Sequence, residues 1–96
     1  MKLSHLNSKT NIAVAGAGVM GLSVAHALRQ FNVTVFDAGA ENSASAMAGG
    51  MLAPWSEVEH LPEDFLDAAV EGIALWEKIL PALGVELHRN GSLIVA

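Results

Sequence analysis

The sequence has no cysteine and few basic residues, and both shortages narrow what the protein can do. Without cysteine the chain can form neither disulfides nor thiolate metal sites, and it has no thiol nucleophile. We therefore expect a cytoplasmic location, because the chain does not need an oxidising compartment. Five Lys and Arg residues against ten Asp and Glu residues give a net charge of −5, with no basic cluster for a nucleic acid.

Long hydrophobic runs are also missing. The apolar stretch 12–28 is interrupted by Gly16, Gly18 and Gly21, so we expect neither a signal peptide nor a membrane span of roughly 20 residues. The four histidines share no ligand spacing, so we expect no metal site. What is present is a composition with 52% hydrophobic residues and a mean hydropathy of +0.41, which is typical of a folded chain.

Residues 11–37 have the pattern of a strand, a helix and a second strand. Residues 11–15 form a short apolar run that ends at a glycine, as in a strand buried on both faces of a parallel sheet. Residues 19–30 carry apolar side chains at helical spacing, and residues 33–37 are rich in β-branched residues. Such a unit of about 30 residues is the βαβ motif of α/β folds.

Residues 16–21 read Gly-Ala-Gly-Val-Met-Gly and fit the G-x-G-x-x-G fingerprint between the expected strand and helix. In this motif Gly16 makes a tight turn, Gly18 lets a pyrophosphate approach the backbone, and Gly21 lets the helix pack close to the strand. Asp37 lies about 20 residues further on, where the fingerprint has an acid for the ribose. A carboxylate there disfavours NADP, because the 2′-phosphate has like charge. The sequence therefore predicts dinucleotide binding.

The rest of the chain predicts a long connection, a helix and a hairpin. The connection covers residues 38–61, has neither strand nor helix periodicity, and is rich in Gly, Ala and Ser. A helix is expected over residues 62–80, because one apolar stripe runs along it and Pro81 follows it. In residues 85–95 the Asn-Gly pair at 90–91 stands between two apolar runs, which predicts a two-residue β-hairpin.

Four segments give the chain a resemblance to a known family. They read GAGVMGLSVAHAL, TVFDAG, SASAMAGGMLAPWSE and GVELHRNGSLIVA, in that order. From about residue 12 to 96 the chain resembles the N-terminal part of the FAD-dependent amine and D-amino-acid oxidases, and within them the glycine oxidases of thiamine biosynthesis. The most specific segment is AGGMLAPWSE.

The resemblance implies an α/β fold with a Rossmann-like FAD-binding βαβ unit of the glutathione-reductase type, followed by a helix and the start of an antiparallel substrate-domain sheet. It places an FAD-binding segment at residues 10–60. Residues 61–96 would then be the helix and β-hairpin that begin an incomplete, interleaved substrate domain. FAD is the implied cofactor, because an NAD domain would continue after Asp37 into another crossover helix, whereas this chain has an irregular loop with paired glycines.

The resemblance also implies which residues contact FAD. Residues 16–21 and 44–45 would surround the pyrophosphate, residues 37–38 the adenosine ribose, and residues 49–51 the isoalloxazine ring. The implied cofactor-binding residues are Gly16, Gly18, Val19, Met20, Gly21, Asp37, Ala38, Ala44, Ser45, Gly49, Gly50 and Met51. No catalytic residue and no metal ligand is implied for this chain.

The implied function is the FAD-binding part of an oxidase that converts glycine, or a similar small amine or amino acid, to the imine with release of hydrogen peroxide, for thiamine biosynthesis. Its partners would be that substrate and oxygen, and we expect it to bind neither nucleic acid nor a membrane. Whether the protein forms a homo-oligomer is left open. The 96-residue chain alone is expected to be inactive, because no residue in it matches a group that fixes a substrate carboxylate. The alternatives are a non-catalytic truncated dinucleotide-binding module and an NAD-binding Rossmann fragment.

Overall fold

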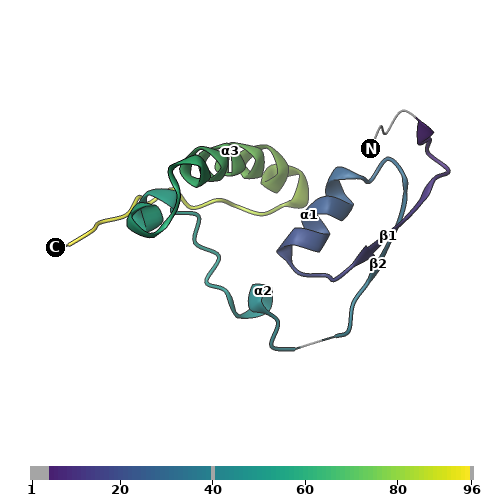
Figure 1. Ribbon diagram of the computed structural model, residues 1–96, viewed down its shortest axis with the longest axis horizontal. Helices are drawn as coiled ribbons and strands as arrows, with labels where there is room; N and C mark the ends of the chain where they lie inside the picture. The colour runs from purple at the N-terminus through teal and green to yellow at the C-terminus, as the bar shows by residue number, and fades with distance from the viewer. Residues whose placement is uncertain (1–4, 40, 96) are drawn as a thin grey trace. The chain divides into compact units, whose positions relative to one another are not determined.

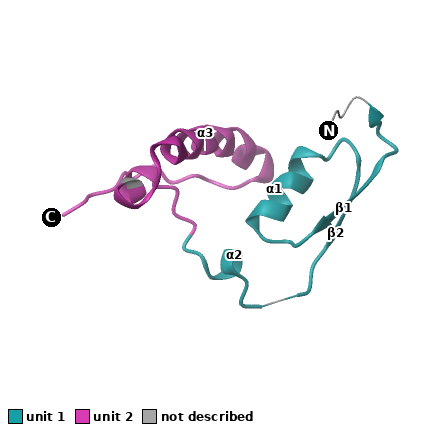
Figure 2. Cartoon of the chain, viewed as in Figure 1, with its two compact units in different colours: residues 1–49 teal, residues 50–96 magenta. Residues whose placement is uncertain are grey.

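The computed structural model describes residues 5–39 and 41–95. The elements follow the chain in the order β1 (Asn11–Ala15), α1 (Val19–Ala27), β2 (Asn32–Phe36), α2 (Ala44–Met47), the 3-10 helix η2 (Pro54–His60), α3 (Glu63–Ile79) and the 3-10 helix η3 (Leu80–Leu83) (Figure 1). The chain divides into two compact units, residues 1–49 and 50–96 (Figure 2). The predicted domain division between residues 60 and 61 stays a prediction about the whole protein.

The first unit contains the predicted βαβ arrangement. β1 and β2 pair in parallel, with Asn11 opposite Asn32 and Ala15 opposite Phe36, and α1 connects them (Figure 1). The first helix ends at Ala27, three residues before the predicted end, because the chain turns there and the Phe31 N–H donates to the Leu28 carbonyl at 2.9 Å. The α/β class and the parallel pairing are therefore confirmed.

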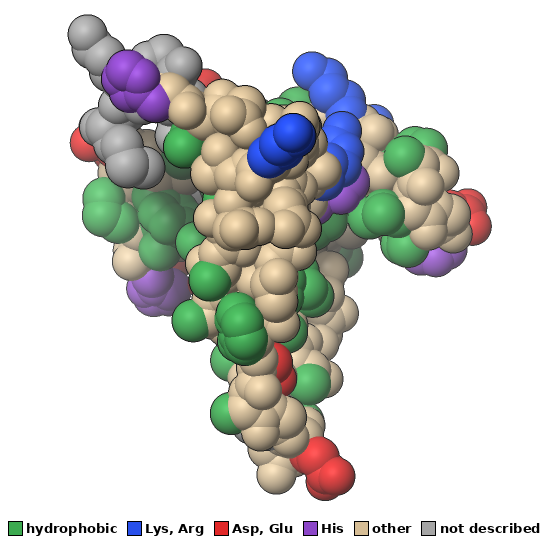
Figure 3. Space-filling view, turned by 90° about the vertical axis from the view of Figure 1, so that its right-hand side faces the viewer, with side chains coloured by type: hydrophobic (Ala, Val, Ile, Leu, Met, Phe, Trp, Pro, Cys, Tyr) green, Lys and Arg blue, Asp and Glu red, His purple; other side chains and the backbone are tan. Residues whose placement is uncertain are grey.

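Little of this chain is buried. Among the residues that the structure describes, Val14 and Pro54 are buried, while Phe36, Phe65 and Leu75 are more than half exposed. The space-filling view shows hydrophobic side chains at the surface of the face drawn (Figure 3). A parallel sheet needs cover on both faces and on its edges. Two strands and one helix do not provide that cover, so β1 and β2 expose apolar surface of the kind that further structure buries.

The second unit is built around α3, which confirms the helix predicted over residues 62–80. Pro62 is its N-cap with φ −57°, and Glu63 and Asp64 lie in its first turn, at the positive end of the helix dipole. The helix passes into η3, which ends at Gly84 with φ +69°, a left-handed conformation that glycine favours. Within residues 5–39 and 41–95, no helix has the length and apolar character to cross a bilayer.

The connection predicted over residues 38–61 contains two short helices, α2 and η2, that its composition did not indicate. Short helices carry no detectable period, and the cap of α2 is local, because the Ser43 hydroxyl accepts the Ala46 N–H at 3.3 Å. The prediction of an irregular segment without helices was therefore wrong.

The β-hairpin predicted over residues 85–95 is not formed in this structure, since the described residues there include no strand, and it stays a prediction about the whole protein. Gly91 does have the positive φ of a tight turn, +73°. An isolated two-stranded hairpin is marginal in water and needs a third strand or a helix against it. Leu93, Ile94 and Val95 are 89%, 70% and 82% exposed, so nothing described here covers this segment.

Candidate functional site

The glycine turn between β1 and α1 bends sharply at its first residue. Gly16 has φ +104°, which residues with a side chain rarely adopt, and its N–H donates to the Phe36 carbonyl at 2.6 Å. Two residues later Gly18 is the N-cap of α1. The turn therefore lies at the carboxyl end of the paired strands, where ligands bind in open α/β sheets.

Gly21 sets how closely α1 approaches this turn. A Cβ atom on Gly21 would overlap the Gly16 carbonyl oxygen, and it would lie 2.9 Å from the carbonyl carbon of that residue and 3.5 Å from Cγ1 of Val14. The two nearest atoms belong to the backbone, so no side-chain rotation relieves the overlap. The absence of a side chain at Gly21 is therefore what allows α1 to begin against the end of β1.

Asp37 follows β2, and its carboxylate is anchored at the same turn. Its Oδ1 accepts the Ala17 N–H at 2.9 Å and its Oδ2 accepts the Gly39 N–H at 3.0 Å. The two hydrogen bonds, with Ala17 first and Gly39 second, favour the ionised form and lower the pKa of Asp37 below its ordinary value. An ionised carboxylate has about four lone-pair sites, so this exposed group keeps acceptor capacity for a ribose hydroxyl.

This anchoring predicts a pH-dependent turn. A carboxyl group whose pKa is lower in the folded state stabilises the fold above its unfolded pKa, and that contribution is lost as pH falls through the folded pKa. We expect an NMR titration of Asp37 to show a midpoint below the ordinary aspartate range, and the Ala17 and Gly39 amide signals to shift with the same midpoint. Amide signals that do not follow the Asp37 carboxyl would contradict the anchoring.

Ser45 reaches the turn from α2. Its Oγ accepts the Val19 N–H, the first of α1, at 2.8 Å. Gly18 leaves room for this contact, because a Cβ atom on Gly18 would lie 3.1 Å from the Ser45 hydroxyl oxygen. The structure thus brings together two residues that are 26 positions apart in the sequence.

Other N–H groups at the start of α1 are available to a ligand. Among the described residues, those of Gly18 and Met20 have no hydrogen-bond acceptor. They lie at the amino end of α1, where unpaired N–H groups and the helix dipole give partial positive charge. The first turn of α1 carries no acidic residue to oppose an anion. This arrangement is the one that binds phosphate groups in dinucleotide-binding proteins.

The other predicted cofactor residues lie outside the turn. Ala38 and Ala44 are exposed residues of the first unit, and Gly49 ends that unit. Gly50 and Met51 belong to the second unit. The structure therefore brings together residues 16–21, Asp37 and Ser45, which were predicted to contact the pyrophosphate and the ribose. The isoalloxazine contacts of residues 49–51 stay a prediction.

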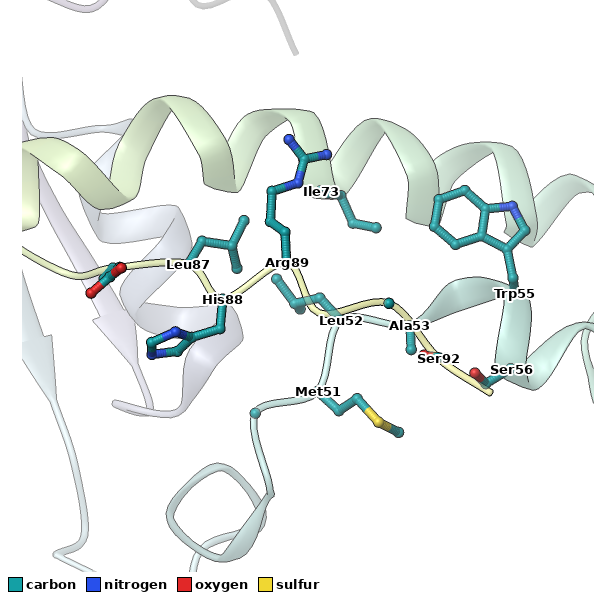
Figure 4. A pocket seen from close by; sticks show the side chains of 13 residues that line it. Met51, Leu52, Ala53, Trp55, Ser56, Ile73, Leu87, His88, Arg89 and Ser92 are labelled. Carbon is teal, nitrogen blue, oxygen red and sulfur yellow. The ribbon is translucent and has the colours of Figure 1, made fainter. Parts of the chain in front are cut away.

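The second unit holds an open cavity of about 610 Å³. Gly50, Met51 and Trp55 line it from the chain before α3, Ile73 lines it from α3, and residues 86–89, 91 and 92 line it from the chain after α3 (Figure 4). The Arg89 guanidinium in this lining is paired with Glu77 at 2.9 Å on the surface. The described residues include no cluster of three metal-ligating side chains, here or elsewhere.

The turn of the first unit and the cavity of the second unit each include groups that the sequence did not indicate. Ala17 and Gly39 anchor Asp37 through their backbone N–H groups, which every residue except proline has, so no side-chain signal could have identified them. The cavity lining from His88 and Ser92 was missed for a different reason, because those residues were assigned to a hairpin.

Comparison with known proteins agrees with this geometry. Residues 11–96 match the model of the family described as "FAD dependent oxidoreductase". Over 89 residues the chain is 45% identical to a Rhizobium etli protein named "Putative thiamine biosynthesis oxidoreductase ThiO", covering 88% of this chain and 26% of that protein. Over 87 residues it is 37% identical to the "NADP(+)-dependent formate dehydrogenase subunit beta" of Moorella thermoacetica, covering 88% of this chain and 10% of that protein. No solved structure matches.

Proposed function

Because the chain belongs to the FAD-dependent oxidoreductase family, whose members bind FAD, we propose that it forms the FAD-binding part of a flavin-dependent amine oxidase. It spans about a quarter of the Rhizobium etli relative and a tenth of the Moorella thermoacetica relative, so the proposal concerns the whole protein. The observation that carries it is the glycine turn, where the Gly18 and Met20 N–H groups lie at the amino end of α1 and Asp37 is anchored beside them.

The residues of the turn suit FAD. The Gly18 and Met20 N–H groups are donors for the pyrophosphate, and the missing side chain at Gly18 lets a phosphate oxygen come close to the backbone. The Asp37 carboxylate is an acceptor for the hydroxyls of the adenosine ribose. A nucleotide with a 2′-phosphate is disfavoured at this turn, because the phosphate would meet the negative charge of Asp37.

The proposed substrate is glycine or a similar small amine or amino acid. Support comes from the 45% identity to a protein whose name refers to thiamine biosynthesis, and we extend that role to this protein as part of the proposal. Bound FAD would supply two-electron oxidation chemistry: the substrate loses a hydride from carbon and a proton from nitrogen to become the imine, and both hydrogens end on oxygen as hydrogen peroxide. The described residues of this chain contribute cofactor binding and orientation, and residues 49–51 are proposed to lie along the isoalloxazine ring.

In the whole protein, residues 85–95 are proposed to join an antiparallel sheet of the substrate domain, in a fold of the glutathione-reductase type. Leu93, Ile94 and Val95 are strand-forming residues with exposed side chains, and Gly91 already has the backbone conformation of a tight turn. A third strand against this segment would supply the support that a lone hairpin lacks.

The proposal predicts a yellow protein. We expect the full-length protein to purify with bound FAD, which denaturation releases for identification by chromatography. We also expect it to release hydrogen peroxide with glycine, sarcosine or D-alanine, measured against a control that contains free flavin only. A colourless protein whose melting temperature rises with NAD, and not with FAD, would contradict the proposal.

A further inference from the structure

Ser45 takes a hydrogen bond that the start of α1 would otherwise offer to a phosphate. The Val19 N–H is one of the first N–H groups of the helix, and it donates to the Ser45 hydroxyl oxygen at 2.8 Å. The Gly18 and Met20 N–H groups on either side of it have no acceptor among the described residues. Ser45 therefore occupies the Val19 donor within the chain and leaves the Gly18 and Met20 donors open.

The same bond joins α2 to the turn. α2 has four residues and no buried side chain, and its Met47 is 70% exposed. A helix this short has little stability of its own. Among the described residues, the bond from Val19 to Ser45 is the hydrogen bond that connects residues 41–49 with the βαβ unit.

Gly18 is fitted to this contact. A Cβ atom at Gly18 would lie 3.1 Å from the Ser45 Oγ and 3.9 Å from the Ser45 Cβ. The shorter distance is tighter than ordinary van der Waals contact, so a side chain at Gly18 would push Ser45 away from Val19. The second glycine of the motif therefore makes room for a hydroxyl of this chain as well as for a ligand.

We propose that Ser45 is a positioning residue of the cofactor site, which holds α2 against the glycine turn by accepting the Val19 N–H and so directs the phosphate oxygens of FAD to the Gly18 and Met20 N–H groups. The cofactor part of this inference rests on the proposed function. The contact between Ser45 and Val19 does not, because it joins two groups of the chain itself.

The first test measures the contact without nucleotide. In the full-length protein, amide hydrogen exchange should show protection of the Val19 N–H, and Ser45→Ala should speed exchange at that amide by roughly tenfold, the loss of about one hydrogen bond. Ser45→Thr keeps the hydroxyl and should restore the protection. Ser43→Ala is the matched control, because it removes the cap of α2 and leaves the bond to Val19 in place. Equal exchange at Val19 in the wild type and Ser45→Ala would overturn the proposal.

The second test measures FAD binding. Ser45→Ala should weaken FAD by roughly tenfold, with recovery in Ser45→Thr and a change of less than about twofold in Ser43→Ala. Gly18→Ala should also weaken FAD, and less so in a Ser45→Ala background, because the contact it disrupts is already gone. Independent effects of the two substitutions, or equal losses in Ser45→Ala and Ser43→Ala, would overturn the positioning role. Absence of FAD binding by the wild type would instead overturn the proposed function, and the exchange at Val19 distinguishes the two failures.

Discussion

Replacing Gly21 with alanine should weaken FAD binding by roughly a hundredfold or more, the loss of two hydrogen bonds to a charged group. The added Cβ atom would overlap the Gly16 carbonyl oxygen, so α1 would have to move away from the turn. The Gly18 and Met20 N–H groups would move with it. The same overlap should destabilise the folded protein by about 1–3 kcal/mol, measured by urea unfolding.

Gly72 provides the matched control for this prediction. It lies within α3, and a Cβ atom there would meet nothing within 4 Å. Gly72→Ala should therefore stabilise the protein by about 0.5–1 kcal/mol, because alanine favours the helix, and it should leave FAD affinity unchanged. If Gly21→Ala and Gly72→Ala behave alike, the close approach at Gly21 is not what shapes the site.

Asp37→Ala should weaken FAD by about ten- to a hundredfold, measured by titrating apoprotein with FAD and following the flavin fluorescence. The substitution removes the acceptor for the ribose, a charge-assisted contact worth roughly 1.5–3 kcal/mol. It also leaves the Ala17 and Gly39 N–H groups without their partner, so the turn loses its tie to the end of β2.

Asp37→Asn separates these two effects. An amide keeps one oxygen for the ribose, but its NH₂ group would face one of the two backbone donors. We expect its FAD affinity to lie between those of the wild type and Asp37→Ala. Asp67→Ala, which removes an exposed carboxylate from α3, should leave FAD affinity unchanged and controls for the change in net charge. Wild-type affinity in Asp37→Ala would show that the ribose is held elsewhere.

Local patterns in the sequence were enough to predict the βαβ unit, the glycine turn and α3. Each depends on residues that are near one another along the chain: a short apolar run before Gly16, helical spacing after Gly18, and a long apolar stripe before Pro81. The structure has a strand, a helix start and a helix at those places. The position of Asp37 at the end of β2 follows from the same reasoning, since the strand places its last residues beside the turn.

Only the tertiary structure decided which hydrogen bonds the polar groups of these elements form. The bonds from Ala17 to Asp37 and from Val19 to Ser45 join residues 20 and 26 positions apart, and their donors are backbone N–H groups, which no sequence pattern distinguishes. The segment 85–95 shows the opposite case. Its turn residues and apolar runs predict a hairpin, but strand pairing needs a supporting surface that the described residues do not provide, so local propensity alone could not form it.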